Sequence, residues 1–277
     1  MMRALLTAGL LGGLFIVLLI GSELLVRRLA PQEINGWGER SALEPDDELG
    51  WRLIPSKTTR LRWVSYDYTV EANSLGFPGP EYSPEKPEST YRIMVTGDAF
   101  TSAEGVDTSQ AWPRLLETDL KTKVRDEDIQ VLNFAMTGYG PNQYAAVVDN
   151  YAPVYKPDLI VIELFVNDFH DVLWSNEDFQ YNIGFGSPNP NSLSSIIKLD
   201  SLRRFTSLNI LGPIKEVLRN QPDANGYFLG HFSALEVGHS EIENDGRQLV
   251  YEKLKNIQDV ANQNGSELVF VFVPAPV

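Results

Sequence analysis

The chain has 277 residues and a formal net charge of −14, from 23 Lys and Arg against 37 Asp and Glu. This length is enough to bury one sizeable core, and the acidic balance argues against a nucleic-acid-binding protein, which would need a basic face for phosphates. The sequence contains no cysteine, which excludes disulfides, thiolate metal sites and a cysteine nucleophile.

The first predicted element is an uncharged apolar run over residues 4–21, with Arg3 before it and Arg27 and Arg28 after it. A run of about 18 apolar residues is near the length that a helix needs to cross a hydrocarbon core. A cleaved signal peptide is the alternative, but the length of the run favours an uncleaved single-pass membrane anchor over residues 1–29. Basic residues at both ends leave its orientation open, and we expect the main domain to be extracytoplasmic.

Residues 30–90 are rich in proline, glycine and charged residues. Within them, residues 61–77 alternate in polarity well enough for one or two strands. Residues 81–90, with the sequence EYSPEKPEST, are typical of a polar linker broken by proline. We therefore expect a small β-rich lead-in to the main domain rather than a second functional domain.

Residues 91–277 alternate predicted strands with predicted helices, which is typical of an α/β fold with a doubly wound parallel sheet. The third and fourth strands are apolar at nearly every position, as expected for parallel strands buried on both faces. Ser109 or Thr108 is expected to cap the first helix, with Pro113 in its first turn. The strands are expected at residues 92–97, 129–136, 159–166 and 268–273, and the helices at residues 109–121, 142–155 and 242–262.

Two features interrupt this alternation. Residues 169–240 have no clear period and are rich in Asn, Ser, Gly and Pro. They are too many for a structureless loop in a compact domain, so we expect short helices there, forming a cap insertion. The sequence also ends at Val277, directly after the fourth strand, whereas doubly wound sheets usually continue, so we expect the domain to be truncated there.

Ligands of doubly wound sheets bind at the carboxyl ends of the strands, so the residues that follow each strand are the candidates for chemistry. Asp98 and Ala99 follow the first strand, Gly138 follows the second, and Asn167 and Asp168 follow the third. No cluster of His, Asp and Glu has the spacing of a metal site. We expect neither a metal nor a cofactor.

Three stretches, in this order, resemble the first three blocks of the SGNH hydrolases, also called GDSL esterases and lipases. They are the Gly-Asp-x-Phe that ends the first strand, the stretch NFAMTGYGPNQY, and the VND that ends the third strand. The resemblance covers about residues 92–274. It implies a flavodoxin-like fold that hydrolyses or transfers ester-linked acyl groups without a cofactor. Members with a membrane anchor and an NSLGF-type lead-in, as at residues 73–77, are also known.

The resemblance further implies the roles of single residues. Position 99 is that of the nucleophilic serine, and the backbone N–H of Gly138 and the side-chain amide of Asn167 would complete an oxyanion hole. Asp98 and Asp168 would support the site. These roles fit the chemistry of acyl transfer, which needs an activated nucleophile and donors aimed at the developing oxyanion.

Two features depart from the family. Ala99 has no hydroxyl group, so the serine mechanism cannot run at this position. Thr101 and Ser102 are two and three residues away, at about 3.3 Å per extended residue, whereas attack needs reacting atoms about 3–3.5 Å apart. The family's late Asp-x-x-His is also missing, and we interpret Glu236-x-x-His239 as a coincidence because it precedes the last helix and strand.

Simpler interpretations exist for the separate pieces. Gly138 could be an ordinary turn glycine, and Asn167 with Asp168 could cap a following helix. An aspartyl phosphatase motif at Asp98 would need a second Asp at position 100, which is Phe100.

The sequence therefore predicts an SGNH-type ester hydrolase or acyl-transfer fold that is inactive as a serine esterase in this chain. The alternative is a non-catalytic envelope protein that binds an acylated or polysaccharide ligand. The expected partners are a membrane, through the N-terminal helix, and a small-molecule or glycan ester.

Overall fold

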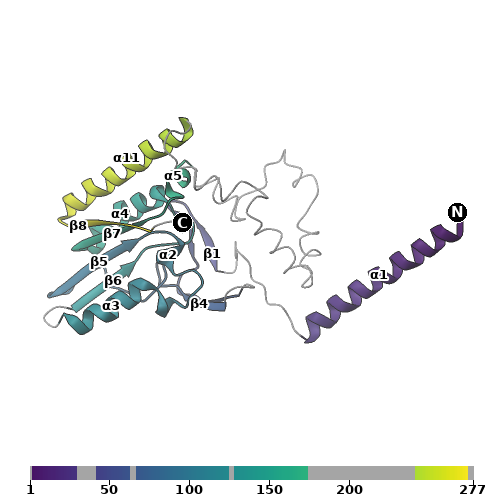
Figure 1. Cartoon of the computed structure of the whole chain (residues 1–277). Helices are drawn as coiled ribbons and strands as arrows, with labels where there is room; N and C mark the ends of the chain where they lie inside the picture. The colour runs from purple at the N-terminus through teal and green to yellow at the C-terminus, as the bar shows by residue number, and fades with distance from the viewer. Residues whose placement is uncertain (1, 30–41, 63–66, 125–127, 174–240, 274–277) are drawn as a thin grey trace. The chain divides into compact units, whose positions relative to one another are not determined.

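The computed structural model of the chain describes residues 2–29, 42–62, 67–124, 128–173 and 241–273 (Figure 1). The larger part of the predicted cap insertion lies outside these ranges, and so does the late Glu-x-x-His stretch. The N-terminal helix and the main domain fall into two different units, and each is described by itself.

The N-terminal unit is described as a single helix, α1 (Met2–Leu29). The predicted apolar run is therefore helical, and its large apolar side chains, such as Leu10 and Phe15, are exposed. In the described part of the chain, no helix is found to be both long and apolar enough to cross a membrane. The membrane anchor stays a prediction.

A four-stranded sheet lies at the centre of the main domain, with the strand order β6-β5-β7-β8 and all neighbours parallel. The chain leaves β5 toward one edge of the sheet and leaves β7 toward the other. The strand order therefore reverses between their carboxyl ends, which is where doubly wound sheets bind ligands. The predicted parallel α/β sheet is confirmed. Its strands are β5 (Thr90–Thr96), β6 (Asp128–Asn133), β7 (Leu159–Leu164) and β8 (Glu267–Phe272).

Helices cover both faces of this sheet, as Figure 1 shows. On one face lies α3 (Trp112–Lys123), and on the other lie α4 (Pro141–Tyr155) and α11 (Glu241–Asn264). Successive residues of a strand point to opposite faces, so β5 and β7 each contribute to two cores. Met94, Ile160 and Ile162 pack with α4 and α11, whereas Ile93, Val95 and Val161 pack with α3.

The predicted cap of α3 is wrong. Thr108–Gln110 form a separate 3-10 turn, η1, and the residue before α3 is Ala111, which makes no side-chain capping bond. The hydroxyl of Thr108 accepts a hydrogen bond from the backbone N–H of Glu71 instead, at 2.9 Å. Its side chain is thus used to hold the lead-in. Pro113 does lie in the first turn of α3, as predicted.

The predicted burial of the fourth strand is also wrong. Leu268 packs into the core, but the apolar side chains of residues 269–272 are between 42% and 50% exposed. Strand β8 pairs with β7 along one edge. Because β8 is the outermost strand of the described sheet, its other edge has no neighbour among the described residues. Its sequence is that of a strand buried on both faces, but its place in the described sheet is that of an edge strand.

The lead-in consists of two antiparallel strand pairs, and it belongs to the core of the main domain. Trp51 and Phe77 are almost fully buried and lie in the same cluster as Met94 of β5. The residues predicted as a simple lead-in therefore contribute a large part of one core. The pairs are β1 (Leu43–Asp46) with β2 (Gly50–Leu53), and β3 (Thr58–Arg62) with β4 (Asp67–Glu71).

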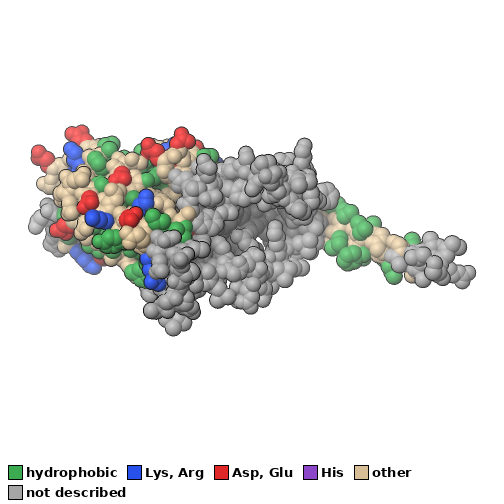
Figure 2. Space-filling view, turned by 90° about the horizontal axis from the view of Figure 1, so that it is seen from above, with side chains coloured by type: hydrophobic (Ala, Val, Ile, Leu, Met, Phe, Trp, Pro, Cys, Tyr) green, Lys and Arg blue, Asp and Glu red, His purple; other side chains and the backbone are tan. Residues whose placement is uncertain are grey.

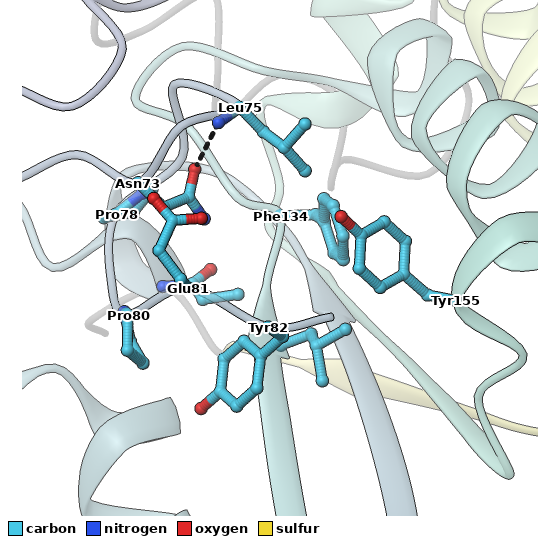
Figure 3. Close-up of a pocket in the computed structure, with 10 residues that line it drawn as sticks. Asn73, Leu75, Pro78, Pro80, Glu81, Tyr82, Phe134 and Tyr155 are labelled. Atoms are coloured by element: carbon cyan, nitrogen blue, oxygen red, sulfur yellow. Dashed lines mark hydrogen bonds between the residues drawn. The ribbon is translucent and has the colours of Figure 1, made fainter. Parts of the chain in front are cut away.

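Figure 3 shows the pocket where the lead-in meets the sheet, between the turn at Asn73 and the rings of Phe134 and Tyr155. The side-chain oxygen of Asn73 accepts the N–H groups of Leu75 and Phe77, each at 3.0 Å, which closes the turn. The pocket has a volume of about 10 Å³, which is room for one water molecule at most. It is therefore a packing defect rather than a ligand site.

Arg92 of β5 fastens the linker at residues 81–90 to the sheet. Its side chain is fully buried, and its guanidinium donates to four backbone carbonyls and one side-chain amide. Three of the carbonyls belong to the linker, and the fourth is at the C-terminal end of α4, where the helix dipole favours a cation. The acceptors are the carbonyls of Ser83 (2.6 Å), Pro84 (3.1 Å), Glu85 (3.1 Å) and Tyr155 (2.8 Å) and Oε1 of Gln130 (2.8 Å).

Candidate functional site

Three loops meet at the carboxyl ends of β5, β6 and β7, next to the point where the strand order reverses. A backbone hydrogen bond from the N–H of Met136 to the carbonyl of Gly97, at 3.3 Å, joins the first two loops. A side-chain hydrogen bond between Ser102 and Thr137, at 3.1 Å, joins them again. The structure therefore places the residues predicted after the first and second strands side by side.

The loop after β5 turns directly into the short helix α2 (Ala99–Ser102). Asp98 is its N-cap residue, and the Asp98 carboxylate accepts the N–H of Phe100 at 2.8 Å. Ala103 ends the helix in the left-handed conformation, with φ of 69°. Ala99 is thus the first residue of a helix that begins at the carboxyl end of a central strand, and it presents a methyl group there.

The two hydroxyl groups nearest to Ala99 are already engaged. Thr101 is fully buried; its hydroxyl donates to Glu163 at 3.2 Å and accepts the indole N–H of Trp112 at 3.3 Å. Ser102 is 8% exposed and bonds to the hydroxyl of Thr137. In the described part of the chain, neither hydroxyl has a histidine or lysine partner that could take its proton. The geometry gives no support to a nucleophile relocated along α2.

The loop after β6 carries Gly138 in the left-handed region, with φ of 81°. Its backbone N–H has no hydrogen-bond partner among the described residues. The lead-in braces this loop from behind, because the indole N–H of Trp51 donates to the carbonyl of Thr137 at 3.0 Å. The hydroxyl of Tyr139 in turn donates to the carbonyl of Trp51 at 2.7 Å. Sequence reasoning missed this role of Trp51, since nothing in the lead-in pattern points to the loop.

The loop after β7 carries Asn167, directly before the short helix α5 (Asp168–Asp171). The Asn167 amide nitrogen donates to Oδ2 of Asp171 at 2.7 Å. An amide nitrogen has two protons; one of them is held by Asp171, and the second has no partner among the described residues. Asp171 was not predicted, although its place four residues after Asn167, one helical turn away, is a signal that could have found it. Gly140 makes room for it, because a Cβ there would lie 3.1 Å from the Asp171 Cβ.

Asp168 lies behind the site rather than in it. It is 1% exposed, and its carboxyl accepts the N–H of Phe165 at 2.8 Å and the hydroxyl of Tyr144 at 3.1 Å. Burial raises the pKa of Asp168 well above its ordinary value. These contacts hold the loop that carries Asn167, so Asp168 supports this loop from behind.

Glu163 of β7 is a further site residue that the sequence analysis missed. It is 2% exposed, and its Oε2 accepts the backbone N–H of Asp98 and the hydroxyl of Thr101, each at 3.2 Å. Burial, together with the neighbouring charge of Asp98, raises the pKa of Glu163 to about 8. The signal was a single acidic residue inside the otherwise apolar stretch LIVIELFV.

Gly97 explains how a glutamate can fit beside this turn. Glu163 lies next to it on the neighbouring strand, because Thr96 of β5 pairs with Ile162 of β7. A Cβ on Gly97 would lie 2.6 Å from Oε2 of Glu163 and 2.7 Å from Oγ1 of Thr101. The glycine of the Gly-Asp motif is therefore needed for space.

An apolar groove begins at Ala99. It has a volume of about 460 Å³ and lies between α2 and the start of α3. Phe100, one of its lining residues, is 52% exposed and packs against Phe165, with ring centroids 5.0 Å apart. Its lining is Ala99, Phe100, Ala103, Glu104, Gly105, Val106, Gln110, Ala111 and Trp112.

Several buried acidic side chains lie in the interior of the site. Among the described residues, no group of three or more His, Cys, Asp or Glu is arranged to hold a metal ion. On the surface, Asp and Glu side chains are interspersed with Lys and Arg on the described face that Figure 2 shows.

No family model matches the chain, and no curated protein matches it. Several solved structures do. AlinE4, described as an SGNH-hydrolase family esterase, is 17% identical over 67% of this chain and 77% of its own, with a TM-score of 0.29. TesA is 19% identical over 62% of this chain and 99% of its own, with a TM-score of 0.27. The lipase/acylhydrolase from Enterococcus faecalis is 17% identical over 64% of this chain and 74% of its own, with a TM-score of 0.24.

At these identities and TM-scores, the matches assign no residue role, activity or substrate to this chain.

Proposed function

We propose that this chain has the fold and the site of an SGNH-type ester hydrolase or acyltransferase, and that it does not act as a serine esterase. The observation that carries the proposal is Ala99. It is the first residue of α2, directly after the N-cap Asp98 at the end of β5, where the family resemblance places a nucleophilic serine. A methyl group there cannot attack a carbonyl carbon.

The magnitude of this loss supports inactivity. In a serine protease, removing the nucleophile alone lowers kcat by on the order of 10⁶. The neighbouring hydroxyls do not replace it, because Thr101 is fully buried and Ser102 is held by Thr137. Oxyanion donors and substrate binding by themselves retain about 10³–10⁴-fold acceleration over water, which is far below an ordinary esterase.

A second candidate function is binding without turnover, of an acylated or polysaccharide ligand. The two groups that favour it are the backbone N–H of Gly138 and the second amide proton of Asn167, which have no partner among the described residues. Both are suited to a carbonyl oxygen. The apolar groove that starts at Ala99 would lie beside the acyl part of such a ligand.

The test of this binding is calorimetry with an acetylated oligosaccharide and its deacetylated form. We expect the wild-type protein to prefer the acetylated form, and Asn167→Ala to reduce that preference by about 0.5–3 kcal/mol, the range for one hydrogen bond whose partner is lost. Asn150→Ala is the matched control, because Asn150 is an exposed residue of α4 that bonds to Glu48. If Asn167→Ala and Asn150→Ala bind the acetylated form equally well, ester binding through Asn167 is refuted.

We further infer that α1 anchors the protein in a membrane and that the main domain is extracytoplasmic. The support is the uncharged run over residues 4–21 and the exposure of the apolar side chains along α1. The test is extraction of cell membranes with alkaline carbonate, which releases peripheral proteins. The protein is expected to stay in the membrane pellet, and its appearance in the supernatant would contradict the anchor.

A further inference from the structure

We propose that Glu163 is the positioning residue of the turn at Ala99, and that it does this in its protonated form, beside the carboxylate of Asp98. The inference goes beyond the proposed function, because it concerns how the turn is held whether or not an ester binds. It assigns a role to a buried acid that neither the motifs nor the oxyanion donors account for.

The geometry places Glu163 behind the turn. Its Oε2 accepts the backbone N–H of Asp98 and the hydroxyl of Thr101, each at 3.2 Å, so one oxygen holds both sides of the turn around Ala99. It can approach this closely because Gly97 has no side chain. Glu163 therefore ties the end of β5 and the body of α2 to β7.

The second oxygen of Glu163 shows that a proton is needed. Its Oε1 is buried and finds no donor among the described residues. Asp98 is the neighbouring acid, since its backbone N–H bonds to Oε2 of Glu163, and two adjacent buried carboxyl groups repel each other when both are ionised. An ionised Glu163 would leave Oε1, which shares the negative charge, buried without a donor, and this is unfavourable.

The proton belongs on Glu163 rather than on Asp98. The Asp98 carboxylate accepts the N–H of Phe100 at 2.8 Å, a shorter bond than the two at 3.2 Å that Glu163 accepts, and a short bond of this kind favours the ionised form. Burial, and then the charge of Asp98, raises the pKa of Glu163 to about 8. Burial also raises the pKa of Asp98, so the pair as a whole keeps one proton at neutral pH.

The other titratable groups that face the pair strengthen this conclusion. From α5, the charge of Asp171 raises the pKa of Asp98, and the pKa of Asp168 is itself raised by burial. From α4, the hydroxyl of Tyr144 is neutral because burial raises its pKa. A second ionised carboxyl would thus be repelled from several directions. Loss of the proton at high pH would place two adjacent charges beneath the turn that carries Ala99.

The raised pKa of Glu163 determines how the stability of the protein changes with pH. The pKa of Glu163 is raised in the folded state, so its contribution to stability is complete below its ordinary pKa of 4.5 and is lost as the pH rises through about 8. Glu163→Gln keeps the shape and the oxygen that accepts the two hydrogen bonds, but it cannot ionise. The variant should therefore lack this pH dependence.

The experiment is urea unfolding of the wild-type chain and of Glu163→Gln between pH 5 and pH 9, together with carbon NMR of labelled glutamate carboxyls, in which the variant assigns the Glu163 signal. We expect the wild type to lose stability across this range and Glu163→Gln to lose less, with a Glu163 midpoint near pH 8. Glu117→Gln is the matched control. It removes another buried glutamate, whose pKa is lowered by Lys121, Tyr82 and other partners despite its burial, and it should lower stability at neutral pH.

Three results would overturn the proposal. One is an unfolding profile of Glu163→Gln with the same pH slope as the wild type. Another is a loss of stability at pH 7 as large as that of Glu117→Gln. The third is the absence of any glutamate carboxyl with a midpoint near pH 8 in the wild type, a result that needs no assignment and can be read even if the variant does not fold. None of these measurements involves a ligand, so they remain decisive if ester binding is not found.

Discussion

Replacing Gly97 by alanine is expected to destabilise the protein by about 1–3 kcal/mol, the usual cost of forcing a methyl group into a packed core. The new Cβ would lie 2.6 Å from Glu163 Oε2 and 2.7 Å from Thr101 Oγ1, whereas ordinary contacts of a Cβ lie at 3.4–4 Å. Both neighbours are buried, Glu163 at 2% and Thr101 at 0% exposure. Neither can swing into solvent to relieve the contact, so we expect the upper half of this range.

Urea unfolding at pH 7 measures this cost, and a double-mutant cycle identifies its origin. In a Glu163→Ala background, the contact with the glutamate is gone, so Gly97→Ala should cost less there, by a coupling of about 0.5–3 kcal/mol. Gly13→Ala serves as the control, because no heavy atom lies within 4 Å of its Cβ. An equal cost of Gly97→Ala in both backgrounds, or a cost within about 0.5 kcal/mol as at an ordinary surface site, would refute the reasoning.

Two further substitutions test how the lead-in supports the site. Arg92→Met removes the donor of five hydrogen bonds and is expected to cost about 1–3 kcal/mol for each carbonyl that stays buried without a donor. It should also speed trypsin cleavage after Lys86, and an unchanged cleavage rate would contradict the role of Arg92 in holding the linker to the sheet. Trp51→Phe replaces the buried indole by a smaller phenyl ring and removes the bond to the carbonyl of Thr137. We expect a loss of at least about 1 kcal/mol in stability and weaker binding of the acetylated oligosaccharide by calorimetry. Equal affinity of Trp51→Phe and the wild type would show that the hydrogen bond from Trp51 to Thr137 does not affect binding at Gly138.

The secondary structure of the main domain could be predicted because its signal is local. The apolar runs that became β5 to β8 and the periodic stretches that became α3, α4 and α11 depend on neighbours in the sequence. Two predictions were wrong, the cap of α3 and the burial of β8, because contacts between distant parts of the sequence decide both. The Thr108 hydroxyl serves the lead-in instead of capping α3, and β8 has an apolar pattern on a strand that lies at the edge of the described sheet.

Sequence analysis identified only those candidate site residues that directly follow the end of a strand. Asp98, Ala99, Gly138 and Asn167 all follow strand ends, so the rule for doubly wound sheets finds them. Glu163 acts through the pairing of β5 with β7, which no local pattern gives. Asp171 and Trp51 were missed for the same reason, since each supports a loop on a different element, and that element is known only once the chain has folded.

The most direct test of the central claim is reaction of the purified wild-type chain with a serine-directed phosphonate, followed by mass spectrometry. Hydrolysis of p-nitrophenyl acetate is measured on the same sample before and after treatment. With Ala99 at the nucleophile position, we predict no phosphonate adduct and no hydrolysis that the phosphonate abolishes. Phosphonate-sensitive hydrolysis, with an adduct mapped to Thr101 or Ser102, would contradict the claim that this chain lacks a serine-type nucleophile.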